Sequence, residues 1–309
     1  GKQKTIYIYQ YPSLRNTPEK DVLLSFITDY DKNTFQDNLK DDMIKQISQF
    51  GLSLNTKNSL PLLKDRVFKS NFPYKKSSHY TKKPNIILFV FESLTPRLIG
   101  AYGCQFPDIT PNIDYFCQKS LRINDCYNAS SATMNGLISL LTSSYPVFGP
   151  KIYNYTGHKG KTPNLLSLME ILKEHGYTSY NITPGRPSYA NHNIFFESEG
   201  IDKIYGISEI KESLNEKSKG KFFGVSDQQV IRFLINLMNK KTDDNPFFIS
   251  LSTVDFHPPF DLPEDCITYS NDNKLLNIIH NTDYAFGLFL KYFQKSKYLN
   301  NTIVIITAD

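Results

Sequence analysis

The 309-residue chain is predicted to fold as an α/β protein, with a mostly parallel, doubly wound sheet flanked by helices. Three observations predict this fold. Continuous apolar runs such as 86–91 are typical of parallel strands that are buried on both faces. These runs alternate with segments whose apolar residues recur at helical spacing. Acidic residues directly follow the first and the last run, at the sheet edge where open α/β folds carry their chemistry.

The alternation can be followed in order along the chain. Strands are expected at 86–91, 177–183, 247–254 and 302–307, and helices at 134–143, 164–175, 227–239 and 273–295. Pro163 suits the first turn of the second helix, and Gly176 suits its end. Ser226 can cap the third helix, in which a set of apolar residues shares one face: Val230, Ile231, Leu234, Leu237 and Met238.

The first 80 residues differ from the rest. They are polar and weakly periodic, although 41–50 and 60–68 are each compatible with a short helix. The stretch 71–84 is rich in turn residues and lysines, which is typical of a linker. We therefore divide the chain into an N-terminal linker segment at 1–80 and a folded domain at 81–309.

Composition disfavours several classes of protein. The net charge of +5 is mild and the basic residues are scattered, so no basic stripe predicts a nucleic-acid partner. No run of about 18 apolar residues occurs, so no membrane span is predicted within the chain. The cysteines contain no Cys-x-x-Cys pair and leave open either two disulfides or four small buried side chains: Cys104, Cys117, Cys126 and Cys266.

Three oxygen-bearing side chains fall where predicted elements begin or end. Glu92 and Asp309 each follow an apolar strand, and Thr133 precedes a helix in a turn of small residues. Two carboxylates and a hydroxyl suit a hard divalent cation such as Mn²⁺ or Mg²⁺, and an added histidine would suit Zn²⁺ as well. The structural alternatives are an ion-paired or helix-capping acid for Glu92 and a helix N-cap for Thr133.

Residues 81–309 resemble the alkaline phosphatase/sulfatase superfamily, and within it the lipoteichoic acid synthase-like phosphoglycerol transferases. The resemblance is carried by six stretches in the family's order: PNIILFVFESL (84–94), SATMNG (131–136), TPNLLSLMEILKEHGY (162–177), GVSD (224–227), NPFFISLSTVDFHPPF (245–260) and NTIVIITAD (301–309). It implies the α/β fold of that superfamily, and it gives 81–309 the place of the catalytic domain.

The resemblance also implies a role for each candidate residue. Glu92 and Asp309 would be metal ligands, and Thr133 would be a ligand and the nucleophile that becomes phospho-threonine. Family members carry a histidine directly after this aspartate, so the domain is expected to be incomplete at its C-terminus. Mn²⁺ is the expected ion, with Mg²⁺ and Zn²⁺ as alternatives.

For substrate binding, the resemblance implies His257, which aligns with a histidine that contacts the head group. The segment 185–193 aligns with a stretch that carries a tryptophan and an arginine, but here these positions hold Ala190 and His192. Arg186 is the positively charged residue of this segment. We therefore take His192 and Arg186 as further candidates, with a solvated loop side chain as the alternative for Arg186 and for His257.

The implied activity is phosphoglycerol transfer from a phospholipid head group to a glycan or polyol acceptor. It would occur outside the cell membrane, in the cell envelope, with the protein tethered by helices preceding residue 1 and with 1–80 as a juxtamembrane segment. Phosphoethanolamine transfer, phosphodiester or sulfate-ester hydrolysis, and an inactive fragment are the alternatives. A true sulfatase is disfavoured, since the sequence lacks Cys-x-Pro-Ser-Arg and Ser-x-Pro-Ser-Arg, and Glu92-Ser93 stands where sulfatases carry two aspartates.

Overall fold

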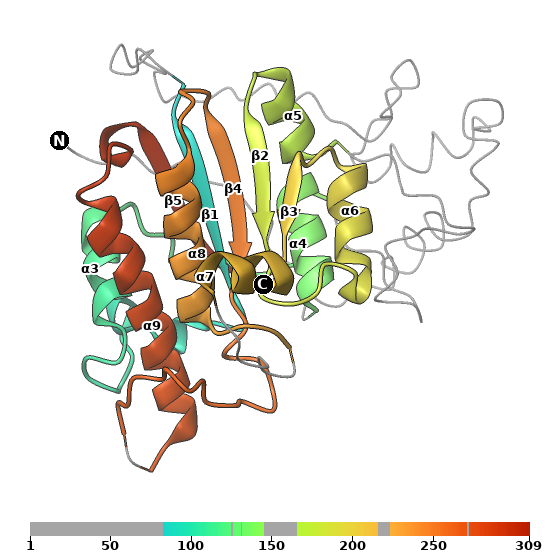
Figure 1. Cartoon of the computed structure of the whole chain (residues 1–309). Helices are drawn as coiled ribbons and strands as arrows, with labels where there is room; N and C mark the ends of the chain where they lie inside the picture. The colour runs from blue at the N-terminus through green and yellow to red at the C-terminus, as the bar shows by residue number, and fades with distance from the viewer. Residues whose placement is uncertain (1–82, 125, 131, 145–165, 216–222, 271) are drawn as a thin grey trace, which may run out of the picture.

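A parallel sheet forms the centre of the molecule, as seen in a computed structural model that describes residues 83–124, 126–130, 132–144, 166–215, 223–270 and 272–309. Its five strands lie in the order β3-β2-β4-β1-β5, and every pairing between them is parallel (Figure 1). The strands are β1 (Asn85–Phe91), β2 (Thr178–Ile182), β3 (Lys203–Tyr205), β4 (Phe247–Ser252) and β5 (Thr302–Ala308). The predicted α/β class is confirmed.

Helices cover both faces of this sheet (Figure 1). One face carries α3 (Pro111–Lys119), α7 (Ile207–Leu214), α8 (Asp227–Lys240) and α9 (Lys274–Phe293). The other face carries α4 (Thr133–Thr142), α5 (Leu168–Glu174) and α6 (His192–Ser198). Short 3-10 turns complete the described elements: η1 (Pro96–Leu98), η2 (Gly100–Tyr102), η4 (Tyr189–Asn191) and η5 (Leu299–Asn301).

Strand β1 is buried on both faces, which explains its continuous apolar sequence. Phe89 packs on α9, where its ring centroid lies 5.2 Å from that of Phe286 and 4.8 Å from that of Phe289. Leu88 and Val90 point the other way and join the core formed with α4, α5 and α6. Because successive side chains alternate between the faces, Glu92 continues the row of Leu88 and Val90 toward α4.

Most predicted elements are found close to their predicted bounds. Ser226 caps α8 with its hydroxyl, which accepts the Gln229 N–H, as expected. The helix predicted at 164–175 instead begins at Leu168, because Ser167 and Glu170 form a capping box there. The elements that were not predicted are α3, α6, α7, β3 and the 3-10 turns. The predicted helices at 41–50 and 60–68, and the predicted boundary near residue 81, lie outside the described residues.

No disulfide joins the four cysteines, all of which lie in described parts of the chain. Cys104, Cys117 and Cys266 are half-buried, and Cys126 is exposed. Cys104 and Cys117 pack against the core on the α9 face, as small apolar side chains do. Among the helices that can be described, none combines the length and the apolar character needed to cross a bilayer.

A buried carboxylate joins two helices on the α9 face. Asp283 of α9 accepts the main-chain N–H groups of Asn112, at 3.1 Å, and Ile113, at 2.7 Å, in the first turn of α3. Thr110, at the start of α3, makes no capping bond of its own, so Asp283 supplies the cap from another helix. Burial is the main cause that raises the pKa of Asp283, to about 6.

This carboxylate predicts a pH dependence of the free energy of unfolding. The folded protein holds the Asp283 proton more tightly than the unfolded chain does, so the contribution is present below the ordinary pKa of 3.8 and is lost as the pH rises to about 6. The full loss should amount to roughly 3 kcal/mol, of which roughly 2 kcal/mol falls between about pH 4 and about pH 7. Urea unfolding at about pH 4 and about pH 7 measures it: the stability of the wild type relative to Asp283→Asn should fall between the two. An unchanged difference would contradict this account.

Candidate active site

The register of β1 and β5 brings two carboxylates together. Phe91 pairs with Ala308 at the carboxyl ends of the two strands, so Glu92 and Asp309 follow at the same level. The Asp309 N–H extends the ladder toward the Phe91 carbonyl at 3.4 Å. Ser93, whose φ is +52°, turns the chain so that its N–H donates to Asp309 Oδ1 at 2.8 Å. The predicted placement of both acids at one sheet edge is thus seen in the structure.

Thr133 approaches the Glu92 carboxylate from α4, a helix on the sheet face opposite α9. It is the first residue of α4, and its hydroxyl donates to Glu92 Oε2 at 3.3 Å. Ala132, in the N-cap position, provides no side-chain cap. One turn into the helix, Gly136 lies against Asp309, since a Cβ on Gly136 would sit 3.4 Å from the Asp309 carbonyl carbon. The structure therefore brings Glu92, Thr133 and Asp309 together.

The carboxylates of Glu92 and Asp309 lie close together, so their negative charges destabilise each other unless a positive charge offsets them. Glu92 is 8% exposed, and burial, followed by the nearby charge of Asp309, raises the pKa of Glu92 to about 8. Hydrogen bonds from Ser93 and Thr133 oppose the rise in part. Two like charges at a buried edge need a proton or a cation to compensate them.

The donor set fits a hard divalent cation. Carboxylate and hydroxyl oxygens are the ligands that Mg²⁺ and Mn²⁺ prefer, and Glu92, Thr133 and Asp309 supply three such groups. In the described part of the chain, no three His, Cys, Asp or Glu residues gather into a metal-binding group. The group described here thus consists of two carboxylates and a threonine hydroxyl.

Two further residues support this group, and sequence reasoning had missed both. Thr253, directly after β4, accepts the Glu92 N–H through Oγ1 at 2.9 Å. Asn128 Nδ2 donates to the main-chain oxygen of Asp309 at 2.8 Å, and to that of Ser130 at 2.7 Å. Both lie in or beside stretches that already carried the resemblance. Their partners lie far away in the sequence, so only the folded chain reveals these contacts.

Phe223 connects two predicted substrate residues. The rings of Phe223 and His257 lie 4.1 Å apart, measured between centroids. The backbone of Phe223 also lies close to Gly185, where an added Cβ would lie 2.7 Å from the Phe223 carbonyl oxygen. Arg186 follows Gly185 and is exposed. We call His257, Phe223 and the Gly185–Arg186 pair the rim, which lies beyond the carboxyl ends of β2 and β4.

His192 lies in the core, and among the described residues no contact between its side chain and the rim is seen. It is 7% exposed, and its Nε2 lies 2.7 Å from Asn181 Oδ1. Asn181 in turn donates to Ser250 Oγ at 2.9 Å, so His192 ends a buried polar chain across β2 and β4. Burial lowers the pKa of His192 to about 4, which keeps the ring neutral. Its role in substrate binding stays a prediction.

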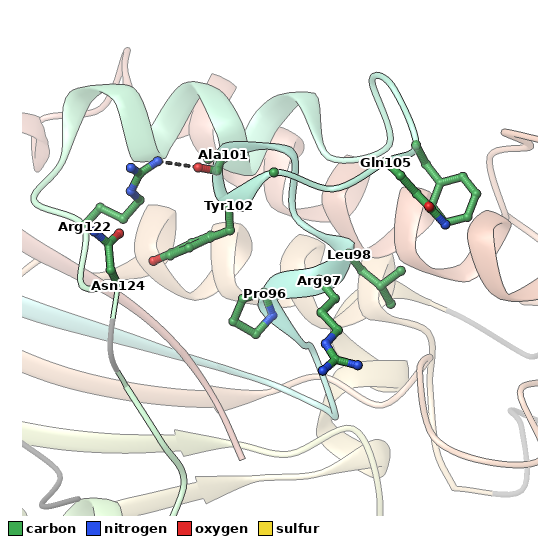
Figure 2. Close-up of a pocket in the computed structure, with 10 residues that line it drawn as sticks. Pro96, Arg97, Leu98, Ala101, Tyr102, Gln105, Arg122 and Asn124 are labelled. Atoms are coloured by element: carbon green, nitrogen blue, oxygen red, sulfur yellow. Dashed lines mark hydrogen bonds between the residues drawn. The ribbon is translucent and has the colours of Figure 1, made fainter.

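A cavity of about 760 Å³ is formed by the segment 96–106 together with Arg122 and Asn124 (Figure 2). Arg122 is fixed on one wall, where it donates to the Ala101 carbonyl and lies over the Tyr102 ring, 5.2 Å from the centroid. Two arginines among the lining residues make this cavity suited to an anionic ligand. The lining residues are Pro96, Arg97, Leu98, Ala101, Tyr102, Gly103, Gln105, Phe106, Arg122 and Asn124.

Comparison with known proteins places these features in a family context. The family model described as Sulfatase matches residues 84–309. Among curated relatives, phosphoglycerol transferase I of Xanthomonas campestris pv. campestris is 22% identical over 238 residues, which cover 74% of this chain and 34% of the relative. The chain thus spans about a third of the length of this relative.

Solved structures give the same fold. A protein in the alkaline phosphatase superfamily from Vibrio parahaemolyticus superposes with a TM-score of 0.59 at 25% identity, covering 74% of this chain and 55% of that chain. The lipoteichoic acid synthase LtaP from Listeria monocytogenes superposes with a TM-score of 0.62 at 20% identity, covering 86% and 61%. The predicted superfamily and its fold are confirmed.

Removal of the Thr253 hydroxyl should destabilise the Glu92 end of β1. Thr253→Val keeps the shape but leaves the buried Glu92 N–H without its acceptor, so the free energy of unfolding should fall by about 1–3 kcal/mol. Thr178→Val at the start of β2 is the matched control, because no hydrogen bond of the Thr178 hydroxyl to a described residue is seen. Urea unfolding of both variants measures the effect, and equal losses would contradict it.

Proposed function

Because the chain belongs to the sulfatase family, we propose that it is a metal-dependent phosphoryl-group transferase of the phosphoglycerol transferase type, with Thr133 as the nucleophile. The observation that carries this proposal is the hydrogen bond of 3.3 Å from the Thr133 hydroxyl to Glu92 Oε2, at the edge where Asp309 also ends its strand. A hydroxyl beside two carboxylates that could hold a cation suits covalent phosphoryl transfer, because the cation would activate the hydroxyl.

The proposed reaction has two balanced steps. In the first, Thr133 Oγ1 attacks phosphorus, a bond from this oxygen to phosphorus forms, and the bond from phosphorus to the leaving oxygen of the lipid breaks. The Thr133 hydroxyl proton passes toward Glu92 Oε2, and the leaving oxygen of the lipid takes up a proton. In the second step, the acceptor hydroxyl attacks phosphorus, so its oxygen bonds to phosphorus and the bond from phosphorus to Thr133 Oγ1 breaks. The acceptor hydroxyl gives up its proton, and Thr133 Oγ1 takes one up. The hydrogen bond to Glu92 orients Oγ1 and holds its proton at the start of the first step.

A divalent cation would be held by Glu92, Thr133 and Asp309, with Mn²⁺ as the proposed ion and Mg²⁺ or Zn²⁺ as alternatives. Such an ion lowers the pKa of a bound hydroxyl and neutralises charge on phosphate oxygens. Support comes from the two acids themselves. Among the described residues, neither Glu92 nor Asp309 forms an ion pair with a lysine or an arginine, so a proton or a bound cation must offset their charges.

The substrate side of the proposal rests on the rim and on the cavity. His257, Arg186 and His192 are proposed as the substrate-binding residues; His257 and Arg186 would contact the head group, and His192, which is buried and lies against Asn181 of β2, would act from beneath them. The cavity carries Arg97 and Arg122, and because Glu92, Thr133 and Asp309 do not line it, we propose it only as an anion-binding surface apart from the nucleophile. The donor would be a phospholipid head group and the acceptor a glycan or polyol.

The proposed location follows from this substrate class. A phospholipid donor requires access to a membrane surface, and the relatives named above are a phosphoglycerol transferase and a lipoteichoic acid synthase. We therefore propose that the domain works at the extracytoplasmic face of the cell membrane.

The nucleophile is tested by Thr133→Ala in the full chain. Turnover of phosphatidylglycerol should fall by about 10³-fold or more, because the substitution removes the oxygen proposed to attack phosphorus. Mn²⁺ binding, measured by calorimetry, should weaken but persist, since Glu92 and Asp309 remain. Thr142→Ala, at the other end of α4, is the control and should keep full activity. Substantial activity of Thr133→Ala would exclude Thr133 as nucleophile.

The acceptor is tested by following phosphatidylglycerol turnover with and without a polyol. A transferase should form glycerophosphate esters of the polyol and should turn over slowly in its absence. Release of free glycerophosphate at the same rate in both conditions would instead indicate a hydrolase of the same superfamily. Turnover of phosphatidylethanolamine alone would indicate phosphoethanolamine transfer.

A further inference from the structure

Residues 253–257 connect the catalytic edge to the rim. At one end, Thr253 accepts the Glu92 N–H, and its own N–H donates to the Val90 carbonyl at 3.1 Å. At the other end, His257 packs on Phe223. The position of His257 relative to Glu92 therefore depends on how firmly this five-residue segment is held.

Two buried aspartates hold the segment. Asp227, the first residue of α8, accepts the N–H groups of Val254, at 2.8 Å, and Asp255, at 3.1 Å, through Oδ1. Asp255 returns the contact, because its Oδ2 accepts the Asp227 N–H at 3.1 Å. Asp227 is 0% exposed and Asp255 is 2% exposed. We call this reciprocal pair the aspartate clamp.

Helix α9 also donates hydrogen bonds to both aspartates of the clamp. The Thr282 hydroxyl donates to Asp227 Oδ2 at 2.7 Å. Asn281 Nδ2 donates to Asp255 Oδ2 at 3.2 Å, and Gln228 Nε2 donates to Asn281 Oδ1 at 2.8 Å. A buried polar network with its partners in place specifies one geometry. The segment is thus tied to the first turn of α8 and to α9 as well as to β4.

We propose that Asp227 and Asp255 are positioning residues, which act through residues 253–257 to set His257 at a fixed place relative to Glu92. This proposal rests on the proposed function for the claim that His257 contacts the head group. The placement of His257 itself is independent of that function, and the two can be tested separately.

The placement is tested by nuclear magnetic resonance of the His257 ring in the full chain, assigned with His257→Gln. The nearby Phe223 ring should shift the His257 signals by its ring current. Asp227→Ala removes the acceptor of both N–H groups, so the shift should be lost and the signals should broaden. Asp227→Asn keeps an oxygen acceptor and should restore most of the shift. Asp283→Ala is the matched control, since Asp283 is also fully buried but caps α3.

The effect of the clamp on activity is measured with phosphatidylglycerol vesicles as the donor. Misplacement of His257 in Asp227→Ala should lower kcat/KM by about tenfold or more, mainly through KM. Asp227→Asn should recover most of this loss. Asp283→Ala should lower the melting temperature but leave KM unchanged. This comparison separates an effect on the position of His257 from a general loss of stability. If Asp227→Ala fails to fold, Thr282→Val removes one partner of the clamp and should give a smaller change of the same kind.

The outcomes separate the two proposals. Unchanged His257 signals in a folded Asp227→Ala protein would overturn the positioning role. Shifted signals with an unchanged KM would overturn the claim that the clamp acts on substrate. If the wild type transfers no phosphoryl group at all, the proposed function fails, while the resonance experiment still decides whether the clamp places His257.

Discussion

The parallel register of β1 and β5 is the constraint on which the candidate site depends. Both strands end at the same level, and the next residue of each is acidic. A slip of one residue would send one carboxylate to the opposite face of the sheet. The register is held by the two-sided burial of β1, whose side chains alternate between the α9 core and the α4 core. Core packing thus keeps two like charges together, at a cost that a bound cation would offset.

Among the described residues, Glu92 lies close to Asp309 and Asp227 lies close to Asp255, and the surroundings of these two pairs of acids differ. Asp227 and Asp255 accept N–H groups from each other's backbone and lie among amide and hydroxyl donors, so the folded chain itself satisfies them. Glu92 instead receives two hydroxyls, from Ser93 and Thr133, which can rotate toward other partners. The first arrangement is typical of a structural network. The arrangement around Glu92 is typical of a ligand-binding or catalytic site.

The parts that could be predicted from the sequence are those with a strong local signal. The apolar strands, α8 with its Ser226 cap, and the three residues Glu92, Thr133 and Asp309 all stand at element ends that periodicity locates. β3 escaped prediction because its three residues are too few to show a pattern. The support of Glu92 by Thr253, 161 residues away, depends on the tertiary fold. The alignment that suggested His192 carried no information on burial; the structure buries this side chain against Asn181 of β2, and its role in substrate binding stays a prediction.

The contact of Gly136 with Asp309 has a consequence for how the site tolerates change. Three Asp309 atoms, the carbonyl carbon, Cα and Cβ, would lie 3.4–3.5 Å from a Cβ at this position, which is an ordinary van der Waals distance. An alanine would therefore fill the space between α4 and Asp309, whereas a side chain that continues beyond Cβ toward Asp309 would push the two apart. Because Thr133 stands one turn earlier on the same helix, such a displacement would also withdraw the hydroxyl from Glu92. The distance between α4 and Asp309 thus limits the size of the side chain at position 136, a residue that carries no reactive group.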